Sequence, residues 1–169
     1  MRKLLYIICA VAGVSLSLMT GCATDECMQN RNALPLAGFY ASTGKHEKIT
    51  LDSIMVLGLG APGDSVLFDG HSRVSQLYLP FRLDTDTTRY LFLYEQKQLA
   101  ALDICDTLTF IYDRTPRFVS SACGVSYVFT IKEIRNSGIL IDSVACPAGE
   151  ITNMAAENLE IYFRVNAGE

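Results

Sequence analysis

The sequence contains no tryptophan and only two histidines, His46 and His71, among 169 residues. General bases and metal ligands are therefore scarce, because histidine most readily supplies both near neutral pH. Charged residues make up 19% of the chain and apolar residues 50%, a composition that argues against disorder. The formal net charge of −4 argues against a general nucleic-acid binder, which needs a basic face to neutralise phosphates. The length favours one domain with its own core.

Long apolar runs are also scarce, apart from the one at the N-terminus. Arg2 and Lys3 precede an apolar stretch from Leu4 to Leu18, which is too short for a comfortable membrane span. The stretch leads into Leu18-Met19-Thr20-Gly21-Cys22, which resembles a bacterial lipobox with Met19 in place of the usual leucine. We therefore expect a lipoprotein signal peptide at the N-terminus. An ordinary secretory signal or an uncleaved anchor is the alternative.

Cleavage before Cys22 would leave a lipidated chain anchored to a membrane. More than one acyl chain makes such an anchor firm, because a single chain binds only marginally. We assign residues 1–21 to the signal peptide, 22–33 to a flexible tether and 34–169 to the folded domain. Loss of residues 1–21 shifts the formal net charge from −4 to −6. Asp25 and Glu26 then follow the anchor, which resembles the acidic export signal of surface lipoproteins in Bacteroidota or is simply a solvated tether.

The cysteine count agrees with an oxidising compartment. Cys9 leaves with the signal peptide and Cys22 takes the lipid, so an even number remains: Cys27, Cys105, Cys123 and Cys146. Two disulfides are expected, and four cysteines allow three connectivities. We favour Cys27–Cys123 with Cys105–Cys146, because the first bond would pin the start of the domain to a central strand. A disulfide that closes such a long loop stabilises the fold by about 4–5 kcal/mol in the chain-entropy model. A zinc site is disfavoured, since no C-x-x-C pair is present.

From Leu34 onward, short apolar runs alternate with turn residues about every ten positions, which predicts an all-β sandwich or barrel. The expected strands are 35–41, 48–58, 66–69, 74–83, 89–95, 102–113, 117–122, 124–135, 139–145 and 158–166. Thr115-Pro116 is expected to be a turn, and Asn136-Ser137-Gly138 to close a hairpin. Only Glu95–Leu102 and Glu150–Glu157 could form short helices.

Period-two alternation supports one buried face for each late strand. Leu108, Phe110 and Tyr112 share one face of their strand. On the next strand the shared face carries Cys123, Val125, Tyr127, Phe129 and Ile131. Such strands are typical of antiparallel sheets that bury one face and expose the other to solvent.

Two loop motifs invite functional interpretations. Residues 58–63 match G-x-G-x-x-G, but a strand and a turn follow where a dinucleotide site needs a helix, so we interpret them as a glycine-rich strand end. Asp84 and Asp86, in an Asp-Thr-Asp-Thr loop, could form a weak metal loop for calcium, although the rest of an EF-hand is missing. A solvated loop is the default, and we predict no cofactor.

Aromatic residues gather on two neighbouring strands: Tyr78, Phe81, Tyr90, Phe92 and Tyr94. Exposed rings there could stack on sugars or on a partner protein, but core packing is the favoured interpretation. His46 and His71 lie in expected loops, and neither a G-x-S-x-G elbow nor a distinctive carboxylate pair accompanies them. We therefore predict no catalytic residue and no enzyme activity.

The mature chain resembles a family of small Bacteroidota lipoproteins known only as a domain of unknown function. The resemblance runs from about Cys27 to Val165 and is carried by Gly38-Phe39-Tyr40, Val66–Ser72, Leu79-Pro80-Phe81, Asp84–Thr87, Leu108–Arg114, Phe118–Ser121, Ala122-Cys123-Gly124, Ile151-Thr152 and Asn158–Phe163. It implies that Cys27 and Cys123 are a recurring pair, with Cys105 and Cys146 an additional one. It implies no catalytic residue, and it suggests an outer-membrane β-barrel protein as a partner.

Taken together, these patterns predict a single antiparallel β-sandwich, with an immunoglobulin-like arrangement as one form, carrying two disulfides and a lipid anchor. We expect a non-catalytic lipoprotein of the bacterial outer membrane, at the periplasmic face or the cell surface. Its expected role is a binding or accessory subunit for a membrane-protein partner. The alternatives are an extracytoplasmic glycan- or peptide-binding module and, third, an envelope enzyme. A partner subunit should show a continuous exposed apolar patch, and a glycan binder a groove with exposed aromatics.

Overall fold

The computed structural model describes residues 34–44, 46–60, 63–121, 124–152 and 156–165, which form two β-sheets and one short helix. The four-stranded sheet has the order β4 (Gln76–Tyr78), β1 (Leu36–Ala41), β10 (Glu157–Phe163), β8 (Ile141–Ala145). The six-stranded sheet has the order β3 (Ser65–Phe68), β2 (Ile54–Leu59), β5 (Thr87–Tyr94), β6 (Cys105–Ser120), β7 (Gly124–Asn136), β9 (Glu150–Ile151). The prediction of an all-β chain is confirmed.

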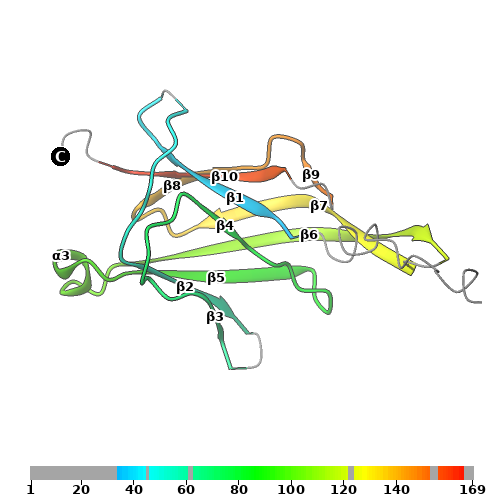
Figure 1. Cartoon of the computed structure of the whole chain (residues 1–169), viewed down its shortest axis with the longest axis horizontal. Helices are drawn as coiled ribbons and strands as arrows, with labels where there is room; N and C mark the ends of the chain where they lie inside the picture. The colour runs from blue at the N-terminus through cyan, green and yellow to red at the C-terminus, as the bar shows by residue number, and fades with distance from the viewer. Residues whose placement is uncertain (1–33, 45, 61–62, 122–123, 153–155, 166–169) are drawn as a thin grey trace, which may run out of the picture.

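One strand pair departs from the predicted antiparallel arrangement. β1 and β10 run parallel, with Phe39 opposite Ile161 and Tyr40 opposite Tyr162. Parallel neighbours start at the same end of a sheet, and Figure 1 shows that this is the end toward which β6 and β7 project. The chain therefore enters the four-stranded sheet on the side of that projection, and the C-terminal end of β10 lies on the opposite side.

The core lies between the inner faces of the two sheets. Phe163 of β10 packs on Phe39 of β1, with ring centroids 5.4 Å apart, and on Phe92 of β5 across the sheets at 6.5 Å. Each fully buried side chain of this size contributes about 1.5–3 kcal/mol. The predicted face of β6 is confirmed, since all three of its predicted residues are fully buried: Leu108, Phe110 and Tyr112.

The cluster of strand aromatics belongs mostly to this core. The buried members are Phe81, Tyr90, Phe92 and Tyr94, so core packing is confirmed for them. Phe81 stacks on Tyr112 with ring centroids 4.6 Å apart. Tyr78 is the exception, because its side chain is 54% exposed on the edge strand β4.

The predicted turn at Thr115-Pro116 is wrong, because β6 runs through it as one strand from Cys105 to Ser120. β5 pairs with β6 only as far as Ile111, so the later part of β6 has β7 as its one partner among the described strands. Pro116 lies in that later part, opposite Tyr127. Proline is tolerated where one side of a strand is open, since its missing N–H then breaks no ladder.

The predicted hairpin between β7 and β8 is also wrong, because the two strands belong to different sheets. The connection is held by Asp106, a fully buried residue of β6. Its carboxylate accepts hydrogen bonds from the backbone N–H groups of Ile139 (2.9 Å), Leu140 (2.7 Å) and Ile141 (2.9 Å). These hydrogen bonds therefore fix the backbone at the point where the chain passes from the six-stranded sheet to the four-stranded sheet.

Regular helix is limited in the described residues to α3 (Lys97–Ala100), within the predicted Glu95–Leu102 segment. The second expected helix is wrong at its start, since Glu150–Ile151 form β9. The expected strand 48–58 is shorter, with β2 at Ile54–Leu59 and single bridges at Lys48 and Leu51. Within the described ranges, no helix is long and apolar enough to cross a membrane.

Candidate functional site

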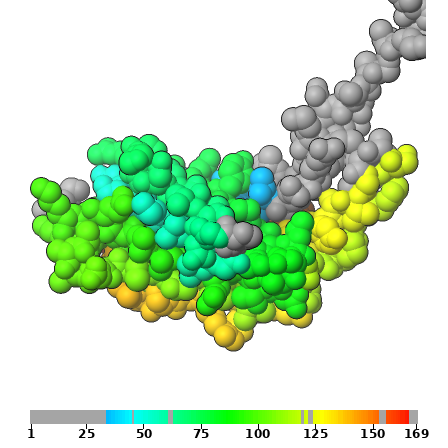
Figure 2. Space-filling model, turned by 90° about the horizontal axis from the view of Figure 1, so that it is seen from below, coloured from blue at the N-terminus to red at the C-terminus, as the bar shows by residue number. Residues whose placement is uncertain are grey.

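The far ends of β6 and β7 form a two-stranded arm, which we define as residues 113–120 and 124–128. β5 stops pairing with β6 at Ile111, and β9 pairs with β7 only at Phe129 and Thr130. Beyond those points the two strands pair with each other alone among the described strands. Figures 1 and 2 show this yellow-green end projecting away from the body of the protein.

One face of the arm continues the inner face of the six-stranded sheet. At its base, Phe129 is 1% exposed and packs against Tyr112, with ring centroids 5.2 Å apart. Toward the tip of the arm, every second residue lies on this same face. These residues pair across the two strands, Pro116 with Tyr127 and Phe118 with Val125. They stay apolar but are exposed, Phe118 by 70% and Val125 by 53%. We call this set the overhang: Pro116, Phe118, Val125 and Tyr127.

Among the described residues, the overhang is thus a core face without an opposing layer. Its alternation matches that of the buried strand, yet β1 and β10 do not extend over it in Figure 1. Cross-strand apolar pairs of this kind normally pack beneath a second sheet. Contiguous exposed apolar side chains indicate an interaction surface. The pattern on β7 was visible in the sequence, but it could not reveal that Phe129 is covered and Tyr127 is not.

Charges on the arm are partly neutralised. Arg114 lies on the overhang's face and pairs with Asp86 at 3.2 Å, while Asp113 pairs with Lys132 at 2.7 Å. The arm residues carry one acidic and two basic side chains, whereas the whole chain is acidic. The arm is therefore slightly basic, and its charge does not oppose an approach to an acidic surface.

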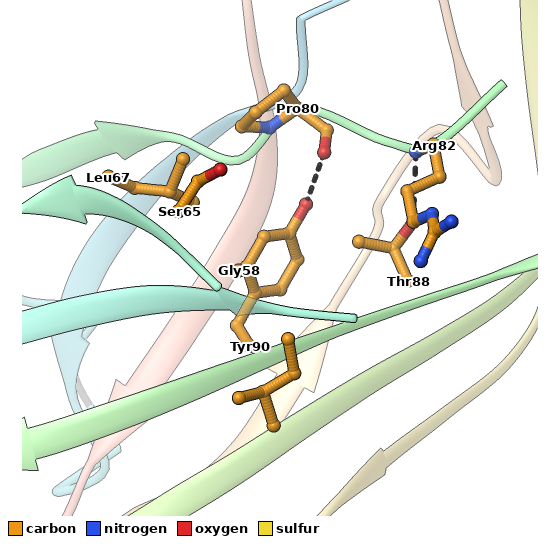
Figure 3. Close-up of a pocket in the computed structure, with 8 residues that line it drawn as sticks. Gly58, Ser65, Leu67, Pro80, Arg82, Thr88 and Tyr90 are labelled. Atoms are coloured by element: carbon orange, nitrogen blue, oxygen red, sulfur yellow. Dashed lines mark hydrogen bonds between the residues drawn. The ribbon is translucent and has the colours of Figure 1, made fainter. Parts of the chain in front are cut away.

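A small cavity of about 110 Å³ lies between β2, β3 and the segment before β5 (Figure 3). The Tyr90 hydroxyl donates to the Pro80 carbonyl at 2.7 Å, and the Arg82 backbone N–H donates to the Thr88 hydroxyl at 2.9 Å. Burial raises the pKa of Tyr90, so its phenol stays neutral. The cavity is mainly apolar, and its lining residues include no paired nucleophile and base. It is large enough for one small apolar group.

Two larger clefts lie near α3, at the end away from the arm. One, of about 440 Å³, lies between the sheets and is lined by Ile54, Tyr94 and Phe163 among others. The other, of about 520 Å³, is lined by Tyr94, Glu95 and Cys105 among others. The aromatic rings in both are buried core residues. Neither cleft is therefore the aromatic-lined groove that the sequence analysis expects of a glycan binder.

The predicted Cys105–Cys146 disulfide is wrong, because both thiols are free. Ile141 lies beside Asp106, next to Cys105, since its N–H donates to that carboxylate. Cys146 lies five residues after Ile141, which is about 16 Å along an extended strand at roughly 3.3 Å per residue. A disulfide requires Cα atoms within about 7 Å. The other predicted cysteine sites, Cys22, Cys27 and Cys123, lie outside the described residues.

Each carboxylate of the suggested metal loop is paired with an arginine. Asp84 accepts from Arg82 at 3.0 Å and at 2.5 Å, and these hydrogen bonds hold the pKa of its carboxyl below the ordinary value. Asp86 pairs with Arg114 instead. In the described part of the chain, no three His, Cys, Asp or Glu side chains are grouped to hold a metal ion. Of the glycine-rich motif, Gly58 and Leu59 end β2, and Gly60 and Gly63 are turn residues before β3; residues 61–62 lie outside the described ranges.

The outer face of the four-stranded sheet carries a hydrogen-bonded group that the sequence analysis missed. Glu157 of β10 accepts a short hydrogen bond from the Tyr40 hydroxyl, and Lys48 Nζ lies 2.7 Å from its other oxygen. The bond to Glu157 raises the pKa of Tyr40 to about 12. Burial acts to raise the pKa of Glu157, but the hydrogen bonds from Lys48 and Tyr40 outweigh it and the pKa is lowered.

A second carboxylate extends this group along β10. Glu160 accepts from the Tyr162 hydroxyl at 2.6 Å, and His46 Nε2 lies 3.5 Å from its other oxygen. The His46 ring stacks on Tyr40, with centroids 4.2 Å apart. Sequence reasoning could not find this group, because its members come from segments more than a hundred residues apart, Tyr40 and Glu157 among them. His71, by contrast, is exposed, and its Nε2 lies 3.9 Å from an Asp69 carboxylate oxygen.

Comparison with known families decides the affiliation of the chain. A family of unknown function, DUF6452, matches residues 53–163. The chain belongs to this family. Comparison with the curated proteins and with the solved structures gives no match. The DUF6452 segment includes the overhang, Asp106 and both carboxylates of β10, and it starts after Tyr40 and Lys48.

Proposed function

We propose that this DUF6452 protein is a non-catalytic lipoprotein of the bacterial outer membrane, a binding or accessory subunit for a membrane-protein partner. The overhang carries the proposal, since it is a ready-made apolar core face that a partner would cover. The domain is proposed to be a β-sandwich, with the immunoglobulin-like form still a prediction. Its anchor is Cys22, and residues 1–21 are the signal peptide.

The position of the first residues of β1 supports contact between the arm and a membrane-embedded partner. β1 begins on the side toward which the arm projects (Figure 1). Leu34 lies twelve positions after Cys22, and a chain of that length spans at most about 40 Å. A lipid on Cys22 would therefore keep the arm close to the bilayer, where an embedded partner such as an outer-membrane β-barrel protein is in reach.

The overhang is small, which sets an expectation for affinity. Four side chains are far fewer than the roughly 20–30 residues per side of a standard interface. Binding in solution should therefore be weak. Confining both proteins to one membrane raises the effective concentration, to about millimolar for short flexible tethers, and makes a small contact sufficient.

A crosslinked pull-down from native membranes tests the proposal, with a tag after Glu169 on the full lipoprotein. The wild-type protein should retain one stoichiometric membrane protein, and the double variant Phe118→Ser/Val125→Ser should lose it. Leu102→Ser is the matched control, because Leu102 is 71% exposed and follows α3 at the other end of the molecule. Prey that is equally abundant with the double variant would refute docking at the overhang.

The lipid anchor has its own test. Cys22→Ser should release the protein from membranes, because the acyl chains would no longer be attached. Retention of that variant in the membrane fraction would contradict lipidation at Cys22. The glycan- or peptide-binding module and the envelope enzyme remain the alternatives if no partner is captured.

A further inference from the structure

The outer face of the four-stranded sheet combines exposed rings with a continuous row of polar groups. On the edge strand β4, Tyr78 and Gln76 point to this face, since they lie opposite Leu36 and Gly38 of β1. Gln76 Oε1 accepts from Lys48 Nζ at 3.2 Å, and Lys48 leads on to Glu157. We call the set the polar face: Tyr40, His46, Lys48, Gln76, Tyr78, Glu157, Glu160 and Tyr162.

The row is held in a defined geometry and remains open to solvent. Glu157 is fixed by two hydrogen bonds, yet its side chain is 22% exposed, and those of Lys48 and His46 are 41% and 50% exposed. Gly38 leaves the space that the carboxylate occupies, because a Cβ there would lie 2.2 Å from the Glu157 carboxyl carbon and would displace it. The carboxylates accept, the ammonium donates and the Gln76 amide does both. Sugar hydroxyls, which donate and accept, match such a mixed row.

We propose that the polar face binds a short oligosaccharide containing amino sugars. Exposed rings lie at both ends of the row, Tyr78 on β4 and His46 stacked over Tyr40 toward β10. Tyr78 lies opposite Leu36, and Tyr162 lies opposite Tyr40 four residues along β1. The row is therefore about 13 Å long in the strand direction, which suits several linked sugars better than one.

The charge of the face selects the kind of sugar. Among the described residues of the face, Glu157 and Glu160 carry two negative charges against the one positive charge of Lys48. A ring that bears an ammonium or a neutral N-acetyl group fits this excess, whereas an acidic sugar is repelled. The site is separate from the overhang, so its occupation is independent of the membrane partner.

Calorimetry on the full lipoprotein in detergent tests the proposal with three probes: hexamers of glucosamine, N-acetylglucosamine and galacturonic acid. The first two should bind and the acidic hexamer should not. Tyr78→Ala and Gln76→Ala should each weaken binding about tenfold or more. Val66→Ala is the matched control, since Val66 is 56% exposed on the edge strand of the other sheet and should leave binding unchanged.

Gly38→Ala provides a check that retains every side chain of the polar face. The new methyl group would push the Glu157 carboxylate away from Tyr40 and Lys48, so affinity should fall although no binding side chain is removed. The proposal is overturned if none of the three hexamers binds, if the acidic hexamer binds best, or if the three variants bind like the wild type. Each of these results leaves the pull-down of the membrane partner unaffected.

Discussion

Replacing Asp106 removes a buried carboxylate that holds the crossover from β7 to β8. Asp106 is fully buried and accepts five hydrogen bonds, from three backbone N–H groups, the Tyr94 hydroxyl at 2.9 Å and the Ser137 hydroxyl. Leaving a buried donor without its acceptor costs about 1–3 kcal/mol. Water can reach part of this turn, because Ile139 is 47% exposed. We therefore expect Asp106→Ala to lower the free energy of unfolding by about 3–5 kcal/mol.

Urea denaturation of wild type and variant measures this difference. Such a loss is a large fraction of the roughly 5–15 kcal/mol that stabilises a typical domain. Asp113→Ala is the control, because its ion pair with Lys132 is 57% exposed on the Asp side and is worth at most about 1 kcal/mol. A loss below about 1 kcal/mol for Asp106→Ala would refute the conclusion that this carboxylate organises the crossover.

The pH dependence gives an independent measure of the same group. Burial acts to raise the pKa of Asp106, but the hydrogen bonds from Ser137 and the backbone N–H groups outweigh it and hold the pKa below its ordinary value. The carboxylate therefore stabilises the fold fully above the unfolded value near 3.9, and this contribution is lost as the pH falls through the folded pKa. The stability gap between wild type and Asp106→Asn should narrow in that acidic range and stay constant near pH 7.

Three further outcomes can be measured on the same material. Phe129→Ala should cost about 3–5 kcal/mol and Phe118→Ala less than about 0.5 kcal/mol, because only Phe129 is buried on the face they share. Gly70→Ala should lower the melting temperature, since its φ is +79° and a Cβ would lie 2.9 Å from a backbone oxygen. Alkylation of unfolded, unreduced protein should label Cys105 and Cys146, as both thiols are free.

Controls separate the causes in these experiments. Gly44→Ala places a methyl group at φ +87° with nothing within 4 Å, so it should cost only the backbone strain of about 1–2 kcal/mol. A Gly70→Ala variant as stable as Gly44→Ala would contradict the steric argument. Equal losses for Phe118→Ala and Phe129→Ala would mean that the overhang is covered. Labelling of Cys105 and Cys146 only after reduction would restore a disulfide.

Local sequence patterns predicted much of the architecture. Leu108, Phe110 and Tyr112 alternate with polar neighbours, and all three are buried as expected. Alternation is a property of a single strand, so it can be recognised without knowing the strand's neighbours. The same holds for turn glycines such as Gly60 and Gly63, whose positive φ depends on the residue itself.

Strand partners were harder to predict. Asn136-Ser137-Gly138 has the chemistry of a hairpin turn, but Asp106, some thirty residues earlier, takes the following N–H groups and directs the chain to the other sheet. The turn signal at Pro116 failed for a related reason, since the strand has an open side there. In both cases a distant segment decides where the backbone hydrogen bonds go.

The amino-acid order alone determines the strand-forming segments and the alternation of apolar residues, because these depend on near neighbours in the chain; the leader stays a prediction. Only the tertiary structure decides which apolar residues are covered. Phe129 and Tyr127 share a face two positions apart, yet one lies under Tyr112 and the other lies on the exposed arm. It also brings Tyr40 to Glu157 and keeps Cys105 from Cys146, because such contacts depend on how distant strands are placed.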